Sequence, residues 1–572
     1  MKKIIIVVIL MSLHFMAYSQ KGPSWLKKAV FYQIYPSSYM DSNGDGVGDI
    51  HGIISKLDYI KSVGVNVLWL NPVCKSGWKD GGYDVIDFYT IDTRFGTNSD
   101  FVELVKEAHK RGLRICMDLV AGHTSTECPW FKQSMEADAN LQHSDYYIWT
   151  NNISEKDKND IVKRHSEPNP ATSVIGQFVE ANAPRARYYL KNFFESQPAL
   201  NYGYYKIDPD CPWQQPVNAP GPSATRQELK NIISFWVGKG VDGFRVDMAG
   251  SLVKNDPDQI ATVKLWQDMR KWYDATYPDH VLIAEWSNPE VAIPAGFNID
   301  FMIHFGQKGY ASLFFGKHTF SYQNDYDECY FDLSGKGHID TFINNYTRAY
   351  NKTKDIGYIS IPTSNHDFQR PNVGTRNTLQ QLKVAMTFFL TMPGVPFIYY
   401  GDEIGMKFIP KLYNKEGSYE RSGSRTPMQW SNGKTAGFST CTPEKLYLPV
   451  NTENGRITVE TEEAEPSSML HFVRKLLRLR KESDALGNDG GWKLLSSVSQ
   501  PYPLVFLRES KTESYVVAIN PSAKKVVCNI PCQKDGRNAF PVSVVGKGIY
   551  KITSQSDRIT LGAISSMVFK LK

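Results

Sequence analysis

The stretch Gly243-Phe244-Arg245-Val246-Asp247 is the part of the sequence that decides the fold. Its pattern predicts the end of a β-strand, and because successive strand side chains alternate, Arg245 and Asp247 would lie on the same face. A guanidinium beside a carboxylate favours ionisation, so Asp247 is a candidate nucleophile whose pKa Arg245 would hold low. Two more carboxylates, Glu285 and Asp367, follow predicted strands in the same way. Three acidic side chains at strand ends indicate one rim of a barrel.

Strand-like and helix-like segments alternate along most of the chain. The strand candidates are apolar without strict alternation, which is typical of a parallel sheet buried on both faces. Helical patterns lie between them, for example at 101–111, 227–238 and 262–273. We therefore predict an α/β fold, a (β/α)8 TIM barrel with its active site at the carboxyl ends of the strands. The eight predicted strands are residues 30–35, 65–70, 113–119, 241–247, 280–285, 298–304, 357–363 and 395–400.

Two departures from this alternation predict additional structure. About a hundred residues, rich in Asn, Pro, Ser and aromatic side chains, separate the third strand from the helix before the fourth, far more than an ordinary loop contains. We assign 124–200 to an inserted subdomain, and 20–123 together with 201–487 to the barrel. Short alternating strands follow the last helix, and they predict a C-terminal antiparallel β-sandwich over 488–572.

The first 19 residues predict a signal peptide rather than part of the fold. Lys2 and Lys3 precede an apolar run, and Ala17-Tyr18-Ser19 is a small-x-small cleavage pattern. We therefore expect export to the periplasm or out of the cell. The apolar run is short, so no stable membrane span is expected in the mature protein. An uncleaved signal anchor is the alternative.

Composition restricts the class of partner. The 572 residues include 65 Lys and Arg against 59 Asp and Glu, and no basic run of the kind that binds nucleic acid is present. A nucleic-acid partner is therefore not expected. The eight cysteines are scattered and predict no disulfide framework, although Cys528 and Cys532 are close enough in sequence to leave one disulfide open.

The loop from Asp41 to Asp49 predicts a site for a hard cation. Oxygen-bearing side chains recur at every second residue and glycines permit a tight turn, which suits Ca²⁺. The loop begins like an EF-hand, but its twelfth position is Gly52 rather than Glu, and a strand is predicted before it. A metal-free acidic turn is the alternative. The expected ligands are the side chains of Asp41, Asn43, Asp45 and Asp49 and the carbonyl of Val47.

Four motifs, in this order, resemble the alpha-amylase family, glycoside hydrolase family 13. They are residues 118–123 (DLVAGH), 243–247, 284–285 and 365–367, and the resemblance runs from about Ala29 to the C-terminus. The segment 425–430 (RTPMQW) is similar to oligosaccharide-acting α-glucosidases, some small α-amylases and trehalose synthases.

The resemblance implies a retaining reaction through a covalent glycosyl intermediate, which requires two carboxyl groups roughly 5–5.5 Å apart. It implies that Asp247 is the nucleophile and that Glu285 is the acid/base, kept partly desolvated by Trp286. It also implies that Asp367 binds sugar hydroxyls and favours the distorted ring.

The same resemblance implies a ring of sugar-binding side chains around this trio. His123 and His366 would hydrogen-bond sugar hydroxyls, and Tyr83 would stack on the sugar ring. Asp84 and Arg370 would contact its far hydroxyls and, as a pair, close the cleft into a pocket. The resemblance also implies Ca²⁺ in the first loop. No metal is expected between barrel and subdomain, because Gly122 stands where many members have a ligating Asn.

These expectations combine into an exported, Ca²⁺-binding hydrolase of α-glucosidic bonds in starch-derived malto-oligosaccharides. The bonds are α-1,4, with α-1,6 left open because Met248 after the nucleophile matches neither preference. The segment Gln197-Pro198-Ala199 leans towards the α-glucosidases but lacks their usual Asp. A transglucosylase or trehalose-synthase-like isomerase is one alternative, since it shares the covalent intermediate. A catalytically lapsed glucan-binding protein is the other.

Overall fold

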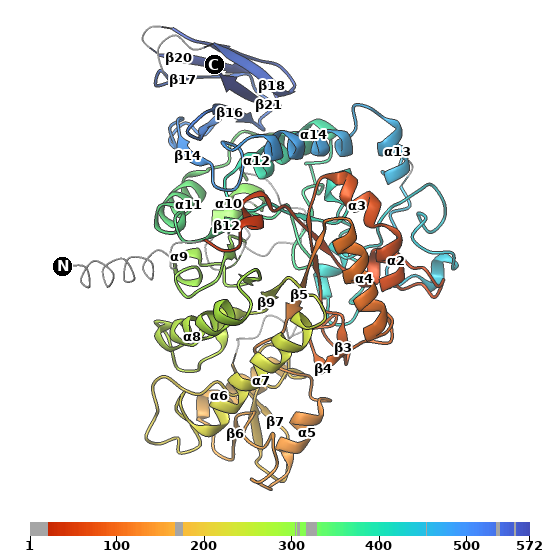
Figure 1. Ribbon diagram of the computed structural model, residues 1–572, viewed down its shortest axis with the longest axis vertical. Helices are drawn as coiled ribbons and strands as arrows, with labels where there is room; N and C mark the ends of the chain where they lie inside the picture. Colours follow the sequence, from red (N-terminus) through yellow and green to blue (C-terminus); the bar gives the residue numbers. More distant parts are fainter. Residues whose placement is uncertain are drawn as a thin grey trace, which may run out of the picture.

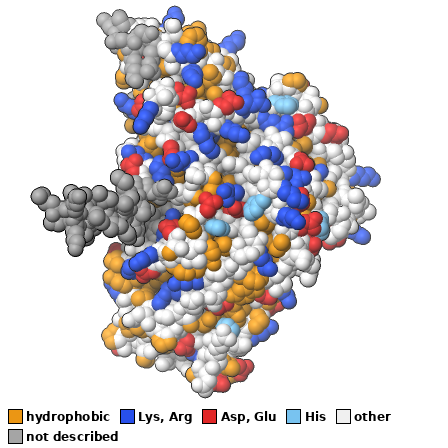
Figure 2. Space-filling view, in the orientation of Figure 1, with side chains coloured by type: hydrophobic (Ala, Val, Ile, Leu, Met, Phe, Trp, Pro, Cys, Tyr) orange, Lys and Arg blue, Asp and Glu red, His pale blue; other side chains and the backbone are white. Residues whose placement is uncertain are grey.

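The computed structural model describes residues 21–165, 176–303, 305, 309–315, 329–453, 455–533, 538–553 and 556–572. The predicted signal peptide, residues 1–19, lies outside the described residues. Within them, no helix combines the length and the apolar character that a membrane crossing requires. On the face in Figure 2, Lys and Arg side chains are interspersed with Asp and Glu rather than gathered into a stripe.

Eight parallel strands form a closed barrel (Figure 1). Seven of them are neighbours in chain order, and the eighth returns to pair with the first. The backbone N–H of Thr363 donates to the carbonyl of Phe397 at 3.0 Å and closes the remaining gap. The predicted (β/α)8 barrel is confirmed. Its strands are β1 Phe31–Ile34, β2 Val67–Leu70, β5 Arg114–Leu119, β9 Gly243–Val246, β10 Val281–Ala284, β11 Ile299–Phe301, β12 Tyr358–Ser360 and β13 Phe397–Tyr399.

The observed strands are shorter than the predicted ones, and they end before the carboxylates that the prediction included in them. Every residue of β9 and β10 is buried, as expected for a sheet covered on both faces. Pairing of these two strands ends with Ala284 opposite Val246. Asp247 and Glu285 are therefore the first residues beyond their strands, at the carboxyl end of the barrel.

Helices cover the outside of the barrel, and their starts follow capping rules. Thr97 and Asp100 form a reciprocal capping box on α4, and Thr378 forms one with Gln381 on α12. The predicted start at residue 227 is wrong, because α7 begins at Pro220, whose fixed φ suits the first turn. The principal helices are α2 Ile50–Ser55, α3 Leu57–Val63, α4 Asn98–Lys110, α7 Pro220–Val237, α8 Ile260–Thr276, α11 Asp340–Thr353, α12 Leu379–Thr391 and α14 Met469–Glu482.

The chain leaves the barrel between β5 and α7 to form the inserted subdomain. Three short antiparallel strands pair in the order β6-β8-β7, and two helices flank them. Where the insert returns, residue 199 forms a bridge with His123, so the exit is tied beside the end of β5. The elements are α5 Pro129–Met135, β6 Trp149–Thr150, α6 Glu155–His165, β7 Phe178–Glu180 and β8 Tyr188–Leu190.

The C-terminal strands form two antiparallel sheets at the end of the molecule opposite the insert (Figure 1). Apolar side chains from both sheets, including Val516, Ile559 and Phe569, share one core. The sheet orders are β14-β15-β16-β21-β18 and β17-β20-β19. Their bounds are β14 Gly491–Leu494, β15 Leu504–Glu509, β16 Ser514–Asn520, β17 Val526–Ile530, β18 Ala539–Val545, β19 Gly548–Lys551, β20 Asp557–Leu561 and β21 Ser565–Leu571.

Two buried arginines fasten these sheets to the barrel. Arg480 on α14 donates to the carbonyl of Leu390, in the last turn of α12, and to that of Met392, just after the helix, at 3.0 and 2.9 Å. Arg508 on β15 donates to the carbonyl of Gly487 at 2.7 Å. Burial lowers the pKa of Arg508 to about 10, and burial together with Arg508 lowers the pKa of Arg480. Carbonyl oxygens solvate both charges, so each arginine connects its own element to the main chain of neighbouring segments.

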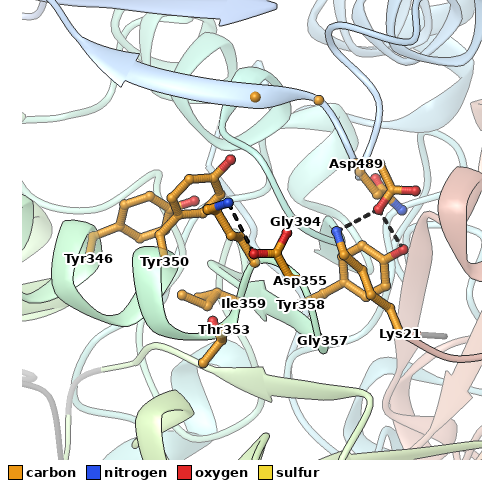
Figure 3. Close-up of a pocket in the computed structure, with 14 residues that line it drawn as sticks. Lys21, Tyr346, Tyr350, Thr353, Asp355, Gly357, Tyr358, Ile359, Gly394 and Asp489 are labelled. Atoms are coloured by element: carbon orange, nitrogen blue, oxygen red, sulfur yellow. Dashed lines mark hydrogen bonds and ion pairs between the residues drawn. The ribbon is translucent and has the colours of Figure 1, made fainter. Parts of the chain in front are cut away.

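A pocket of about 170 Å³ lies beside this junction (Figure 3). Lys21 Nζ and Tyr358 Oη both contact Asp489 Oδ1, at 2.7 and 2.9 Å, and Tyr346 and Tyr350 line another wall. Its lining includes the residues that precede β12 and β13, so it lies at the amino ends of the strands. The pocket is therefore at the opposite end of the barrel from the strand-end carboxylates.

Candidate active site

The side chains of Asp247 and Glu285 are joined by one guanidinium. Arg245 Nη1 lies 2.9 Å from Asp247 Oδ1, and Arg245 Nη2 lies 2.7 Å from Glu285 Oε1. Strand alternation places Arg245 and Asp247 on one face, as the sequence predicts. The Arg245 residue is only 2% exposed, so solvent weakens these ion pairs little.

Asp118, at the end of β5, is a third carboxylate on the same guanidinium, with Oδ1 2.5 Å from Arg245 Nη1. It also accepts hydrogen bonds from Trp69 Nε1 and Tyr83 Oη, at 3.1 and 3.0 Å. Burial raises the pKa of Asp118 to about 6, although Arg245 opposes the shift. Asp118 belongs to the 118–123 motif, but it was not among the predicted site residues.

Burial raises the pKa of Glu285 to about 8, and the neighbouring Asp247 and Asp367 add to the shift. Arg245 opposes it, as does the backbone N–H of Met248, which donates to Glu285 Oε2 at 2.9 Å. Met248 adopts a left-handed conformation, with φ of 45°, directly after Asp247. A carboxyl group with this pKa carries a proton at neutral pH, as a general acid must.

The expected low pKa of Asp247 is not what the structure gives. Burial raises its pKa to about 7, and Asp118, Asp80 and Asp367 add to the shift. Arg245 lowers it, but the charge of Arg245 is shared by three carboxylates. Asp247 and Glu285 therefore titrate as a coupled pair close to neutrality.

His366 is held as the neutral tautomer with its proton on Nε2. Its Nδ1 lies 2.9 Å from Gln33 Nε2 and 3.2 Å from Asn71 Nδ2, and both amide groups are donors. Its Nε2 lies 3.0 Å from Asp367 Oδ2 and 2.8 Å from Tyr83 Oη. Burial lowers the pKa of His366 to about 4, which agrees with an uncharged ring.

Asp367 is the acidic member of the site that stays charged. Burial opposes its ionisation, but His366, Arg421 and Arg425 together hold its pKa well below the usual value. Arg421 Nη1 lies 2.9 Å and Arg425 Nη2 lies 3.3 Å from Asp367 Oδ1. Because of the two arginines, Asp367 is ionised at neutral pH, whereas Asp247 and Glu285 titrate close to neutrality.

The structure brings Tyr83 and His123 to the same place. The Tyr83 ring stacks on His366, with 5.4 Å between ring centroids and 10° between planes. His123 Nε2 lies 3.1 Å from the Tyr83 carbonyl and its Nδ1 lies 2.9 Å from Asn192 Nδ2, so protein groups engage both ring nitrogens. Burial lowers the pKa of His123 to about 3. The sugar contacts expected of Tyr83 and His123 stay predictions.

Asp84 points into its own turn rather than across the cleft. Its Oδ1 accepts from the Ser76 hydroxyl at 3.0 Å and from the backbone N–H groups of Lys79 and Asp80 at 3.0 and 3.1 Å. The residue is fully buried just before β4 (Val85–Ile91), and burial raises its pKa to about 6. Asp84 therefore closes the 76–84 turn.

Arg370 pairs with another carboxylate, so the expected Asp84–Arg370 pair is wrong. The fully buried guanidinium lies 2.9 Å from Asp402 Oδ1 and donates to the carbonyl of Tyr400 at 2.6 Å. Asp402 also accepts from the hydroxyls of Thr363 and Ser364, which begin the loop that leads to Asp367. Arg370, through Asp402, thus fixes the start of the loop that leads from Thr363 to Asp367.

The pair that the sequence analysis missed is Asp80 with Arg421. Arg421 Nη2 lies 2.9 Å from Asp80 Oδ1, while its Nη1 contacts Asp367. Gln197, at the return of the insert, donates to Asp80 Oδ2 at 2.9 Å. Asp80 lies only four residues before Asp84 in the same segment, and Arg421 lies four residues before Arg425, so both were close to quoted motifs.

The acidic loop turns its side chains towards its own backbone. Asn43 Oδ1 accepts from the N–H of Asp45, and Asp45 Oδ1 accepts from the N–H of Val47, at 2.9 and 2.8 Å. Asp41 accepts three N–H groups of the loop, and Asp49 caps α2. The donor types suit a hard cation. Among the described residues, however, no three or more His, Cys, Asp or Glu side chains gather closely enough to hold a metal.

A family model for the alpha amylase catalytic domain matches residues 33–489. The chain belongs to the alpha-amylase family. This alpha-amylase family chain is 32% identical to oligo-1,6-glucosidase from Parageobacillus thermoglucosidasius over 562 residues, covering 89% of this chain and 92% of that protein. It is 31% identical to trehalose synthase/amylase TreS from Mycobacterium tuberculosis over 526 residues, covering 85% of this chain and 80% of that protein.

Solved structures of alpha-amylase relatives agree with this assignment. Trehalose-6-phosphate hydrolase from Bacillus licheniformis matches with a TM-score of 0.75 and 27% identity, covering 96% of this chain and all of that one. Trehalulose synthase MutB from Pseudomonas mesoacidophila matches with a TM-score of 0.76 and 25% identity, over the same shares of the two chains. The relatives are therefore named as hydrolases in some cases and as synthases in others.

Replacing Arg421 tests the charge network around Asp367. The variant Arg421→Met removes the cation that joins Asp80 to Asp367, so the pKa of Asp367 rises and both carboxylates lose their positions. We expect kcat/KM on an α-glucoside to fall roughly 100-fold, the cost of misplacing site groups by about 1 Å. The control Lys411→Met changes an exposed lysine nearby and should leave kcat/KM unaltered. Wild-type kcat/KM in Arg421→Met would refute this assignment.

The pH dependence of kcat/KM tests the coupled pair. Asp247 must be ionised, so the rate should rise as pH increases through about 7; Glu285 must hold its proton, so the rate should fall as pH increases through about 8. The two apparent values belong to the pair. The Glu285→Gln variant, assayed on an aryl glucoside with a good leaving group, should lose the alkaline fall. A fall that persisted there would show that another group supplies the proton.

Proposed function

We propose that this protein is an exported retaining hydrolase of α-glucosidic bonds in malto-oligosaccharides. The observation that carries the proposal is the guanidinium of Arg245 between Asp247 and Glu285, at 2.9 and 2.7 Å. A guanidinium that contacts both carboxyl groups keeps them in one place, and a retaining enzyme requires its nucleophile and its acid/base to be close, whereas an inverting enzyme leaves room for a water between them. The exported state rests on the pattern of residues 1–19, and N-terminal sequencing should find a mature chain that begins at Gln20.

The first step breaks the glycosidic bond. Glu285 gives its proton to the glycosidic oxygen, and Asp247 attacks the anomeric carbon and forms an ester with the sugar. The leaving sugar departs as an alcohol. The raised pKa of Glu285 favours this step, because the proton is already in place at neutral pH.

The second step releases the sugar. Glu285, now ionised, takes a proton from water, and the hydroxide oxygen bonds to the anomeric carbon as the bond to Asp247 breaks. Both groups return to their starting states. Arg245 remains beside both carboxylates and limits the charge change that each step brings.

Asp367 and His366 would hold the sugar during both steps. The charged Asp367 suits the positive charge that develops on the ring in the transition state. The Nε2 of neutral His366 already contacts Asp367 and the Tyr83 hydroxyl, so His366 would act on the sugar by orienting these two groups, and the Tyr83 ring beside it offers a flat surface. These assignments follow the roles that the family resemblance implies.

The Asp80–Arg421 pair supports a pocket that removes sugars from a chain end. The pair stands beyond Asp367 and is bound to the insert through Gln197, so it limits the space on that side of the site. An open cleft for internal attack would need that space for further sugars. This proposal replaces the Asp84–Arg370 closure expected from sequence.

A transglucosylase or sugar isomerase is the second candidate, and specific relatives favour it. Trehalose synthase/amylase TreS and trehalulose synthase MutB are named for such reactions. The first step would be the same, but a sugar hydroxyl rather than water would attack the ester on Asp247. A binding protein without catalysis is disfavoured, because binding alone does not require a protonated Glu285 beside Asp247.

A time course of products from the purified mature protein separates these functions. We expect early glucose from maltotetraose as the chain end is trimmed, and glucose from isomaltose if α-1,6 bonds are also cleaved. Trehalose or longer sugars as main products would favour the transferase, and a spread of shorter oligosaccharides from starch would contradict the pocket. No turnover by a protein that still binds glucans would refute the proposal as a whole.

We propose further that Ca²⁺ binds the loop of residues 41–49 through Asp41, Asn43, Asp45, Asp49 and the Val47 carbonyl. Ca²⁺ would stabilise the turn that precedes α2, without any part in the chemistry. Removal of Ca²⁺ by a chelator should lower Tm, and Ca²⁺ but not Na⁺ should restore it. The Asp45→Asn variant should weaken this response. A Tm that does not depend on Ca²⁺ in the wild type would contradict the site.

A further inference from the structure

We propose that Asp300 is a positioning residue for the acid/base Glu285. Asp300 is the middle residue of β11, and its backbone lies in register with Ala284, the last residue of β10 and the one before Glu285. Its side chain is fully buried. The inference rests on the proposed function, because it concerns how well Glu285 delivers a proton.

The carboxyl group of Asp300 binds the loop that follows Glu285. Its Oδ1 accepts from the backbone N–H groups of Trp286 and Ser287 at 3.1 and 3.3 Å, and its Oδ2 accepts from that of Asn288 at 2.8 Å. Three successive amides directly after Glu285 therefore converge on one buried side chain. A buried carboxylate is costly unless it is satisfied in this way.

The loop of residues 286–288 requires these hydrogen bonds because its backbone is strained. Ser287 has φ of 54°, a left-handed conformation that is unusual for a residue other than glycine. Its hydroxyl donates to the carbonyl of Phe305 at 2.6 Å. Trp286 packs over Gly250, where an added Cβ would come within 2.5 Å of the indole nitrogen. Contacts on both sides thus hold the turn that directs Glu285 towards Asp247.

Asp300 would act through Glu285 and not on the sugar. Its three hydrogen bonds go to the main chain of residues 286–288, whereas the Glu285 side chain pairs with Arg245. Loss of these bonds would let the loop relax and move the carboxyl group of Glu285. Proton delivery should therefore suffer more than sugar binding or attack by Asp247.

Leaving-group dependence distinguishes a positioning role from general damage. We expect Asp300→Ala to lower kcat/KM roughly 30- to 100-fold on phenyl α-glucoside, which needs a proton to depart, since positioned acid catalysis contributes about 10²–10⁴-fold. On 2,4-dinitrophenyl α-glucoside, whose leaving group departs without a proton, the loss should be less than about 5-fold. The conservative Asp300→Asn keeps one carbonyl acceptor and should recover most of the difference.

Asp242→Ala is the matched control. Asp242 is also a buried carboxylate that accepts a backbone N–H, that of Ile115 at 2.8 Å, but it precedes β9 at the amino end of the barrel. Its loss should lower stability and leave the ratio between the two substrates as in the wild type. The comparison thereby distinguishes a loss of barrel stability from a loss of proton transfer by Glu285.

Equal losses on both substrates in a folded Asp300→Ala protein would overturn the inference alone. Should Asp300→Ala fail to fold, Asp300→Asn takes its place, with an expected selective loss of roughly 3- to 10-fold on the phenyl glucoside; an unchanged ratio there would overturn the inference too. A wild-type protein that cleaves neither glucoside and also leaves maltotetraose uncleaved would overturn the proposed function and the inference with it.

Discussion

The active site depends on one ion-pair cluster, the guanidinium of Arg245 shared by Asp118, Asp247 and Glu285. Three ionised carboxylates this close would repel one another without a cation between them. Burial also disfavours the ionised form, so without Arg245 all three groups would stay protonated. One positive charge cannot neutralise three negative ones. The site therefore retains protons at neutral pH, which is the state that acid catalysis at Glu285 requires.

A second group of cations gives Asp367 the opposite behaviour. Arg421 and Arg425 reach it from the loop after β13, and neutral His366 donates from beneath, so its pKa is held well below the usual value. Asp367, whose side chain is 20% exposed, thus differs in charge from the more deeply buried Asp247 and Glu285 because separate arginines contact it. A donor sugar held between them would meet a protonated acid on one side and a fixed negative charge on the other.

Strand periodicity explains why the barrel and the trio could be predicted, whereas the contacts around the trio could not. Alternation and strand order are local properties, and they place Asp247 and Glu285 at the rim without knowledge of the loops. Arg421 reaches Asp80 across 341 residues from an irregular segment that carries no periodic signal. The expected Asp84–Arg370 pair failed because the spacing of a short motif does not tell which carboxylate closes its own turn.

The contrast between periodic strands and irregular segments also bears on whether water or a sugar attacks the proposed ester on Asp247. Buried ion pairs at strand ends form the centre of the site, and relatives named as hydrolases and as synthases can share such a centre on one fold. The insert and the loop after β13 meet beside these groups, where Phe194 and Tyr419 come within 6.0 Å between ring centroids. We expect the molecule that attacks the ester on Asp247 to meet side chains of these two segments. Linkage and acceptor preference are therefore expected to depend on the insert, where the sequence has the least pattern, rather than on the catalytic trio.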